Sequence, residues 1–132
     1  MSNSSNENKN FFKENTNGVS VVDYEKIKDN LGGNEHLLIT IIKSFLEDVH
    51  SILEELESLL NKKQFSEFES KAHTYKGMLC NLEAKNLIEL CADLETLAKQ
   101  QESEQMLKTL NQLHSGTSHL IKELEGYLKF AA

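Results

Sequence analysis

Apolar residues in this chain recur at alternating steps of three and four along four long segments, and proline is absent from all 132 residues. This spacing places apolar side chains on one face of an α-helix, and no segment alternates apolar and polar residues for long enough to form a sheet. The clearest segment contains Leu38, Ile42, Phe45, Val49, Ile52, Leu56 and Leu59. A chain of this length supports one domain with one core. We therefore expect a single all-α domain.

Polar residues and glycines divide the chain into the expected helices. A short helix begins after Asp23, whose side chain is a good N-cap, and ends at Gly32-Gly33. Four longer helices are expected over about 34–61, 65–80, 87–99 and 103–129, with Asn34 and Ser103 as N-caps. Short links between long amphipathic helices force neighbours to run antiparallel. The sequence predicts an antiparallel up-and-down four-helix bundle over residues 19–132, with a short extra N-terminal helix.

Residues 1–18 differ in composition from the rest of the chain. They are rich in Asn and Ser, and the pair Phe11-Phe12 is all they offer for burial. Such a composition does not bury enough apolar surface to offset the entropy of ordering, so we predict a disordered tail. The two phenylalanines are interpreted as incidental, and docking onto the bundle or onto a partner is the alternative.

The overall charge and the cysteines limit the classes of function. A net charge of −7 with scattered lysines opposes binding to nucleic acid. No run approaches about 18 uninterrupted apolar residues, so no membrane span is expected.

Cys80 and Cys91 form no spaced disulfide framework and no signal-peptide pattern opens the chain, which favours a cytoplasmic location. His114 and His119 are five residues apart, a poor helical spacing for a shared metal ion, so no metal site is expected.

The stretch Ala72-His73-Thr74-Tyr75-Lys76-Gly77 combines an ionisable nucleophile, a cation and a missing side chain on one predicted helix. At about 100° per residue, His73 lies roughly 110° from the middle of the apolar stripe and should face water. Lys76 and Gly77 lie one turn after it, at the spacing that brings side chains into contact. This stretch is the candidate site, and we call residues 72–77 the acceptor stretch.

The acceptor stretch resembles the A-H-x-L-K-G phosphoacceptor motif of histidine-containing phosphotransfer (HPt) domains, with Tyr75 in place of the usual Leu. Two further segments are similar to the family pattern: residues 31–35 resemble its L-G-G-D-x start of the first long helix, and residues 90–95 its L-C-x-x-L-E. Together the three segments cover about residues 21–98. The turn Leu82-Glu83-Ala84 departs from the family's L-G-A, and Glu83 should resist the left-handed backbone that glycine adopts there.

The resemblance implies a phosphoryl carrier in a multistep phosphorelay, without kinase or nucleotide-binding activity of its own. His73 would accept a phosphoryl group from an aspartyl phosphate on a receiver domain and pass it to another receiver. Lys76 would offset the added negative charge, and Gly77 would let the partner approach. Any Mg²⁺ would belong to the receiver, so this chain itself needs no cofactor.

The partners implied are response-regulator receiver domains, a hybrid histidine kinase, or both, bound by a monomer. We expect Glu69, Ser70 and Cys80 to contribute to the partner surface around the acceptor histidine. The alternative is a helical adaptor that binds a receiver or kinase without transferring phosphate. A third function is disfavoured, namely that of the dimerisation and acceptor domain of a sensor kinase. The latter usually has an acidic residue after the histidine and a nearby proline, whereas Thr74 follows here.

Each residue of the site also has an ordinary structural interpretation. Lys76 would then be a solvated lysine paired with a carboxylate one turn away, and Gly77 would mark a close helix crossing. The histidines outside the acceptor stretch are interpreted as surface or boundary residues. Cys80 and Cys91 are interpreted as packing residues.

Overall fold

The computed structural model describes residues 22–131, and these form five α-helices with no strand among them. The helices are α1 (Tyr24–Asn30), α2 (Glu35–Asn61), α3 (Phe65–Cys80), α4 (Lys85–Lys99) and α5 (Ser103–Ala131). This confirms the expected all-α fold. The predicted tail, residues 1–18, lies outside the described residues.

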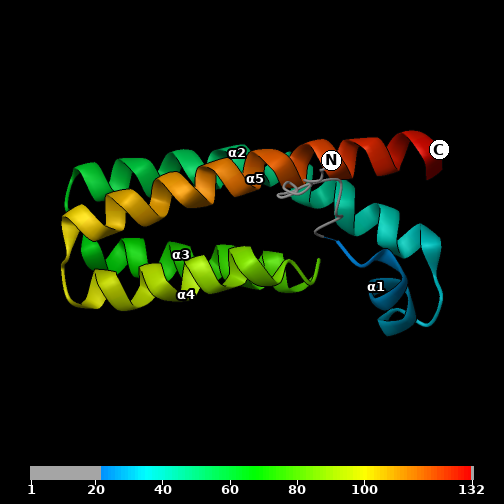
Figure 1. The fold of residues 1–132 in the computed structure, drawn as a ribbon, viewed down its shortest axis with the longest axis horizontal. Helices are drawn as coiled ribbons and strands as arrows, with labels where there is room; N and C mark the ends of the chain where they lie inside the picture. Colours follow the sequence, from blue (N-terminus) through cyan, green and yellow to red (C-terminus); the bar gives the residue numbers. More distant parts are fainter. Residues whose placement is uncertain (1–21, 132) are drawn as a thin grey trace, which may run out of the picture.

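Helices α2 to α5 form an antiparallel up-and-down bundle (Figure 1). Each helix packs against the next one in the chain, and α5 returns to pack against α2, so that α3 and α5 lie diagonally across the bundle. Helices α2 and α5 have 27 and 29 residues, whereas α3 and α4 have 16 and 15. The two longer helices therefore extend beyond the α3–α4 hairpin, and α1 lies near the start of α2 (Figure 1).

The helix starts show which local signals were reliable. The side chain of Asp23 accepts a hydrogen bond from the Lys26 amide at 3.1 Å, and that of Asn34 accepts from the Leu37 amide at 3.0 Å, so both predicted N-caps are confirmed. The prediction for Ser103 was wrong. Ser103 is already the first residue of α5, and the Glu102 carbonyl accepts the first helical hydrogen bond, from the Met106 amide, at 2.9 Å.

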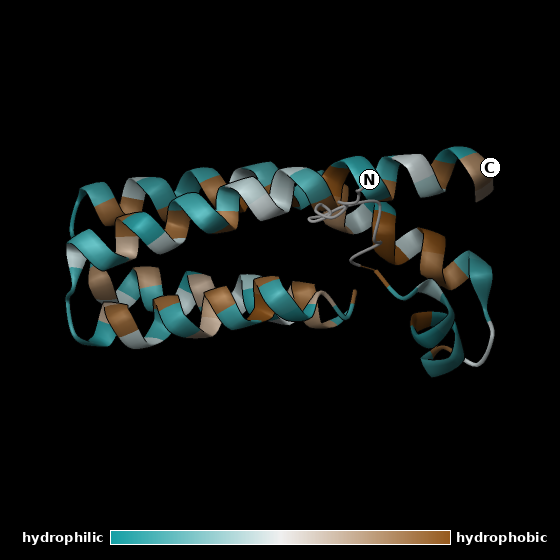
Figure 2. Cartoon of the chain, viewed as in Figure 1, coloured by the Kyte–Doolittle hydropathy of each residue, from teal (hydrophilic) through white to brown (hydrophobic). Residues whose placement is uncertain are grey.

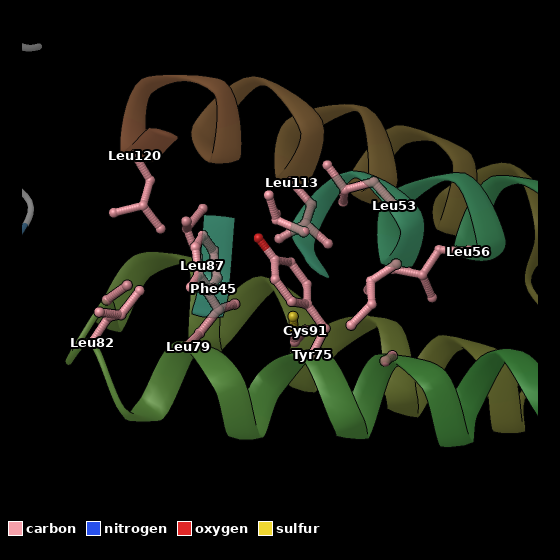
Figure 3. Close-up of a cluster of buried hydrophobic side chains, with 14 of the residues drawn as sticks. Phe45, Leu53, Leu56, Tyr75, Leu79, Leu82, Leu87, Cys91, Leu113 and Leu120 are labelled. Carbon is pink, nitrogen blue, oxygen red and sulfur yellow. The ribbon is translucent and has the colours of Figure 1, made fainter. Parts of the chain in front are cut away.

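The core consists of the apolar stripes of all the helices, while hydrophilic residues predominate on the outer faces (Figure 2). In the acceptor helix α3 the buried residues follow the predicted stripe, although Phe65 at its start is only half-buried. Figure 3 shows Tyr75 reaching from α3 into the centre of this core, among Phe45, Cys91 and Leu113. Core packing of this kind makes α3 a rigid support for its exposed face.

The irregular junction after the acceptor helix adopts the left-handed backbone that its sequence disfavours. Glu83 has φ +54°, and its amide and that of Ala84 bond back to the carbonyls of Cys80 and Leu79. This is the hydrogen-bond pattern of a Schellman turn, in which glycine is the usual residue. Two residues of α1 contact the Glu83 carboxylate: Lys26 by an ion pair of 3.2 Å and Asn30 by a hydrogen bond of 3.4 Å.

Candidate functional site

The imidazole of His73 lies on the outer face of α3. Ala72, Tyr75 and Leu79 are fully buried and hold the helix against the bundle. The His73 side chain, in contrast, is 71% exposed. A partner molecule in solution can therefore reach the ring without any rearrangement of the fold.

Glu95 of α4 joins His73 to Lys76. One carboxylate oxygen, Oε1, lies 3.2 Å from His73 Nδ1, and the other, Oε2, lies 2.6 Å from Lys76 Nζ. The Glu95 side chain is only 14% exposed. Its Oε2 atom is buried, and the ion pair with Lys76 is its one polar contact among the described residues. We call these three residues the His73–Glu95–Lys76 cluster.

The charge of Glu95 decides which nitrogen of His73 is free. Burial raises the pKa of the Glu95 carboxyl, but hydrogen bonds from Lys76 and His73 outweigh burial and bring the pKa below its ordinary value. Glu95 is therefore ionised at neutral pH and can only accept hydrogen bonds. Nδ1 of His73 must then carry the proton, which leaves the lone pair of the neutral ring on Nε2.

Lys76 does not pair with a carboxylate on its own helix. Its partner is Glu95 on the neighbouring helix α4, and the Lys76 side chain is 27% exposed. An ion pair at this boundary is less screened by water than one on an open surface. The ammonium thus lies next to the residue that binds the His73 ring.

Gly77 is exposed, and a side chain at this position would meet no part of the fold. A Cβ atom built on Gly77 has no other atom within 4 Å, apart from its own neighbouring backbone. Close crossing of another described helix therefore does not account for this glycine. Its cost to the helix, about 1 kcal/mol relative to alanine, has no compensation inside the described part of the chain.

Comparison with protein families decides the class of this protein. The family model described as Hpt domain matches residues 40–126, which include the whole acceptor stretch and Glu95. The chain belongs to the Hpt family. No curated protein and no solved structure matches the chain. Hpt domains are phosphocarrier modules of two-component signalling, in which they work with receiver domains and histidine kinases.

The Hpt family model covers two of the three segments that resemble the family pattern. The acceptor stretch and residues 90–95 lie inside residues 40–126. Residues 31–35 and helix α1 lie outside it, so the similarity at the start of the first long helix stays a prediction.

The three residues predicted to meet a partner lie in different surroundings on α3. Glu69 is engaged within the Hpt domain, because its carboxylate forms a 2.9 Å ion pair with Lys99 of α4. Ser70 is exposed, and its carbonyl oxygen accepts a hydrogen bond of 3.2 Å from the Thr74 hydroxyl. Cys80 is a free, exposed thiol at the end of α3.

A groove between α2 and the end of α3 lies outside the His73–Glu95–Lys76 cluster. It is lined by Ile41, Ser44, Phe45, Asp48, Met78 and Asn81. Met78 is half-buried in this groove, in agreement with the helical spacing, which directs Met78 away from the His73 face. It therefore does not cover the imidazole.

Within residues 22–131, the remaining groups that could carry chemistry do not form a second site. Burial raises the pKa of the Cys91 thiol to about 12, so this cysteine is a packing residue in the core. Within residues 22–131 no group of three or more His, Cys, Asp or Glu side chains is placed to hold a metal ion. No helix among these residues is both long enough and apolar enough to cross a membrane.

Sequence reasoning missed Glu95 as a site residue. Its signal was present, because Glu95 is the last residue of the segment 90–95 that resembles the family pattern. The contact with His73, however, depends on how far α4 is shifted along α3. That register is set by the turn at residues 81–84, whose geometry the sequence left open.

Proposed function

We propose that His73 is the phosphoacceptor of this Hpt domain. It takes a phosphoryl group from the aspartyl phosphate of one receiver domain and passes it to the aspartate of another. The observation that carries the proposal is the exposed imidazole whose Nδ1 is bound by the ionised Glu95, 3.2 Å away. This contact leaves Nε2 as the nucleophile.

The acceptance step uses the chain's own residues in separate roles. Nε2 attacks the phosphorus, the bond between phosphorus and the aspartate oxygen breaks, and the aspartate leaves as a carboxylate. Lys76, one turn from His73, compensates the charge of about −1.5 to −2 that a phosphoryl group adds to a side chain. Gly77 keeps the approach to Nε2 open, since no described group fills the space above it. The Mg²⁺ that assists such transfer belongs to the receiver.

The test is transfer of radiolabelled phosphate from a purified receiver that has been charged with a small-molecule acyl phosphate. The wild-type chain should acquire one label per molecule, stable in base and labile in acid. His73→Gln should acquire none. His50→Gln and His119→Gln are matched controls, because both residues are exposed histidines on helices, and both variants should be labelled like the wild type. A labelled His73→Gln protein would overturn the assignment.

The adaptor alternative makes a different prediction in the same experiment. An adaptor would bind the receiver equally well with and without His73, and no phosphohistidine would form. We also propose that the domain acts as a monomer in the cytoplasm. Light scattering separates a monomer from the dimer that a sensor-kinase acceptor domain would form.

A further inference from the structure

The second half of the relay, in which His73 gives up its phosphoryl group, places a chemical demand on the ring. When the bond between Nε2 and phosphorus breaks, its electron pair returns to Nε2. If Nδ1 carries a proton, the ring leaves as neutral imidazole. If Nδ1 is bare, the ring must leave as an imidazolate anion, which is a far poorer leaving group. The release step therefore needs a group that keeps a proton on Nδ1 of the phosphorylated ring.

Glu95 has the position and the charge for this task. Its Oε1 lies 3.2 Å from Nδ1, and it projects from a different helix, so its place does not depend on the conformation of α3 alone. An ionised carboxylate beside a ring nitrogen favours the protonated form of that nitrogen. The Glu95 side chain is only 14% exposed, whereas the His73 side chain is 71% exposed, so water reaches this contact from the His73 side and screens it in part.

The other charges around His73 balance one another or are already paired. On α3 these are Lys76 and Glu69, and on α4 they are Glu95 and Lys99. Glu69 and Lys99 form an ion pair of 2.9 Å, so the two groups together carry no net charge. Between α2 and α3, Glu55 forms an ion pair of 2.9 Å with Lys71.

Lys76 makes the effect of Glu95 depend on phosphorylation. In the unphosphorylated chain its ammonium lies 2.6 Å from Glu95 Oε2 and neutralises part of the carboxylate charge. A phosphoryl group on Nε2 offers the ammonium a more highly charged partner. Oε2 has no other polar contact among the described residues. Once the ammonium of Lys76 turns to the phosphoryl group, the main positive partner of the Glu95 carboxylate is therefore the proton on Nδ1 of His73.

We infer that Glu95 is a positioning residue for phosphoryl release: as Lys76 turns to the phosphoryl group, Glu95 holds the proton on Nδ1 of phospho-His73, so that the ring leaves as neutral imidazole. This inference rests on the proposed function of His73. In the step itself the bond between Nε2 and phosphorus breaks, a bond between phosphorus and an aspartate oxygen of the receiver forms, and the Nδ1 proton stays on the ring. No other reactant is required.

The test compares wild type with Glu95→Gln, whose amide oxygen can still accept the Nδ1 hydrogen bond but carries no charge. The full chain is phosphorylated with phosphoramidate, a donor that needs no receiver, and phospho-His73 is followed by ³¹P NMR from pH 5 to 9. The chemical shift gives the midpoint of Nδ1 protonation, and signal decay gives the rate of hydrolysis. In Glu95→Gln the midpoint should fall by about one pH unit, and release at pH 8 should slow about tenfold.

The rates of the two proteins should converge near pH 5, where both rings are protonated. Lys76→Gln should raise the midpoint of Nδ1 protonation. The substitution removes a cation, so the full negative charge of Glu95 then stabilises the protonated ring. Glu55→Gln, which removes a carboxylate paired with Lys71, should leave the midpoint unchanged.

A merely structural role for Glu95 would slow release by the same factor at every pH and leave the midpoint where it is in wild type. That result in Glu95→Gln, or a Lys76→Gln midpoint that falls, would overturn the inference. The outcome is separable from that of the proposed function. Failure of a charged receiver to label His73 refutes the relay, whereas the NMR titration tests Glu95 without any receiver.

Discussion

The hydroxyl groups of Tyr75 and Thr117 lie 2.8 Å apart in the centre of the bundle, and both side chains are fully buried. They come from α3 and α5, the helices that lie diagonally across the core. Apart from Tyr75 itself, Thr117 is the one fully buried side chain with a hydroxyl group among the described residues. Tyr75 stands where the resembled motif usually has leucine, so Thr117 supplies the hydrogen-bond partner that this departure requires.

Removing either hydroxyl alone should destabilise the fold, whereas removing both should cost little. Tyr75→Phe or Thr117→Val leaves one buried hydroxyl without its partner, at a cost of about 1 to 2 kcal/mol. The double variant replaces a hydrogen-bonded pair by an apolar contact of similar shape, and its free energy of unfolding should lie within about 1 kcal/mol of wild type. Urea unfolding of the four proteins measures the coupling. Strictly additive losses would contradict this account.

Gly77→Ala should make the protein more stable and a poorer phosphoacceptor. A methyl group at this position meets no other atom of the described fold within 4 Å. Replacing a glycine inside a helix by alanine is worth about 0.5 to 1 kcal/mol, and urea unfolding should show this gain. Transfer from a charged receiver should slow, because the new side chain stands where the partner approaches.

Gly126→Ala is the matched control for Gly77. Gly126 lies in α5, and a Cβ atom there also has no neighbour within 4 Å. This variant should gain stability to a similar extent and accept phosphate at the wild-type rate. If Gly77→Ala also transferred at the wild-type rate, the role of Gly77 in partner access would be wrong.

Gly116→Ala should behave differently from Gly126→Ala in the same helix. A Cβ atom on Gly116 would lie 2.5 Å from the Cδ2 methyl of the buried Leu87, so that side chain must move within a packed core. Overpacking of this kind costs about 1 to 3 kcal/mol, which offsets the helical gain. In urea, Gly116→Ala should be at least about 1 kcal/mol less stable than Gly126→Ala. In a Leu87→Ala background, which removes the methyl, the same substitution should become stabilising.

Much of the fold could be predicted from local signals. Asp23 and Asn34 marked the starts of α1 and α2, and the polar links after residues 61 and 80 bounded α3 correctly at Phe65 and Cys80. Each of these signals acts within one or two helical turns. The N-cap prediction failed at Ser103 because Gln101 adopts a left-handed backbone and turns the chain one residue earlier. Glu102, and not Ser103, therefore takes the N-cap position of α5.

The sequence pattern does not predict which side chains of neighbouring helices contact one another. Periodicity placed Tyr75 and Thr117 on buried stripes, and His73 on an exposed flank. It could not pair Tyr75 with Thr117, or His73 with Glu95, because such pairs depend on how far one helix is shifted along another. In α3 and α4 that shift follows from the turn at Glu83, which adopts a conformation its residue type disfavours.

The charge on Glu95 should make stability depend on pH. Its carboxyl pKa is lower in the folded chain than in the unfolded one, so the ionised form stabilises the fold. This contribution is complete above the unfolded pKa of about 4.3 and is lost as the pH falls through the lower folded value. Glu95→Gln should therefore be less stable than wild type at pH 7, by about 1 to 2 kcal/mol.

The difference between wild type and Glu95→Gln should narrow as the pH falls below the unfolded pKa of about 4.3, and it should close once the folded carboxyl is protonated as well. Urea midpoints at pH 7, 5 and 3.5 measure it. Glu55→Gln is the control, because its ion pair with Lys71 is half-exposed and should contribute less than about 1 kcal/mol at any pH. A Glu95→Gln deficit that stayed constant down to pH 3.5 would show that packing, and not charge, is what the substitution disturbs.

Three helix junctions offer a route to a more stable domain. Lys63, Glu83 and Gln101 have φ values of +56°, +54° and +57°, and each lies at the glycine position of a Schellman turn. A side chain in this region costs about 1 kcal/mol or more. Gln101→Gly should therefore raise the free energy of unfolding by about 0.5 to 1 kcal/mol. Lys63→Gly should gain an amount near the lower end of this range, because it also removes the exposed 3.4 Å hydrogen bond from Lys63 Nζ to Ser103 Oγ.

Glu83→Gly should gain less than the other two, although it restores the glycine usual in the family's turn. The substitution relieves the same backbone strain but removes the ion pair with Lys26 and the hydrogen bond from Asn30, which together join α1 to the α3–α4 turn. Glu83→Ala separates the two effects, because it loses the contacts and keeps the strain, and it should be less stable than wild type. If Glu83→Gly gained as much as Gln101→Gly in urea, the contacts with α1 would contribute nothing to stability.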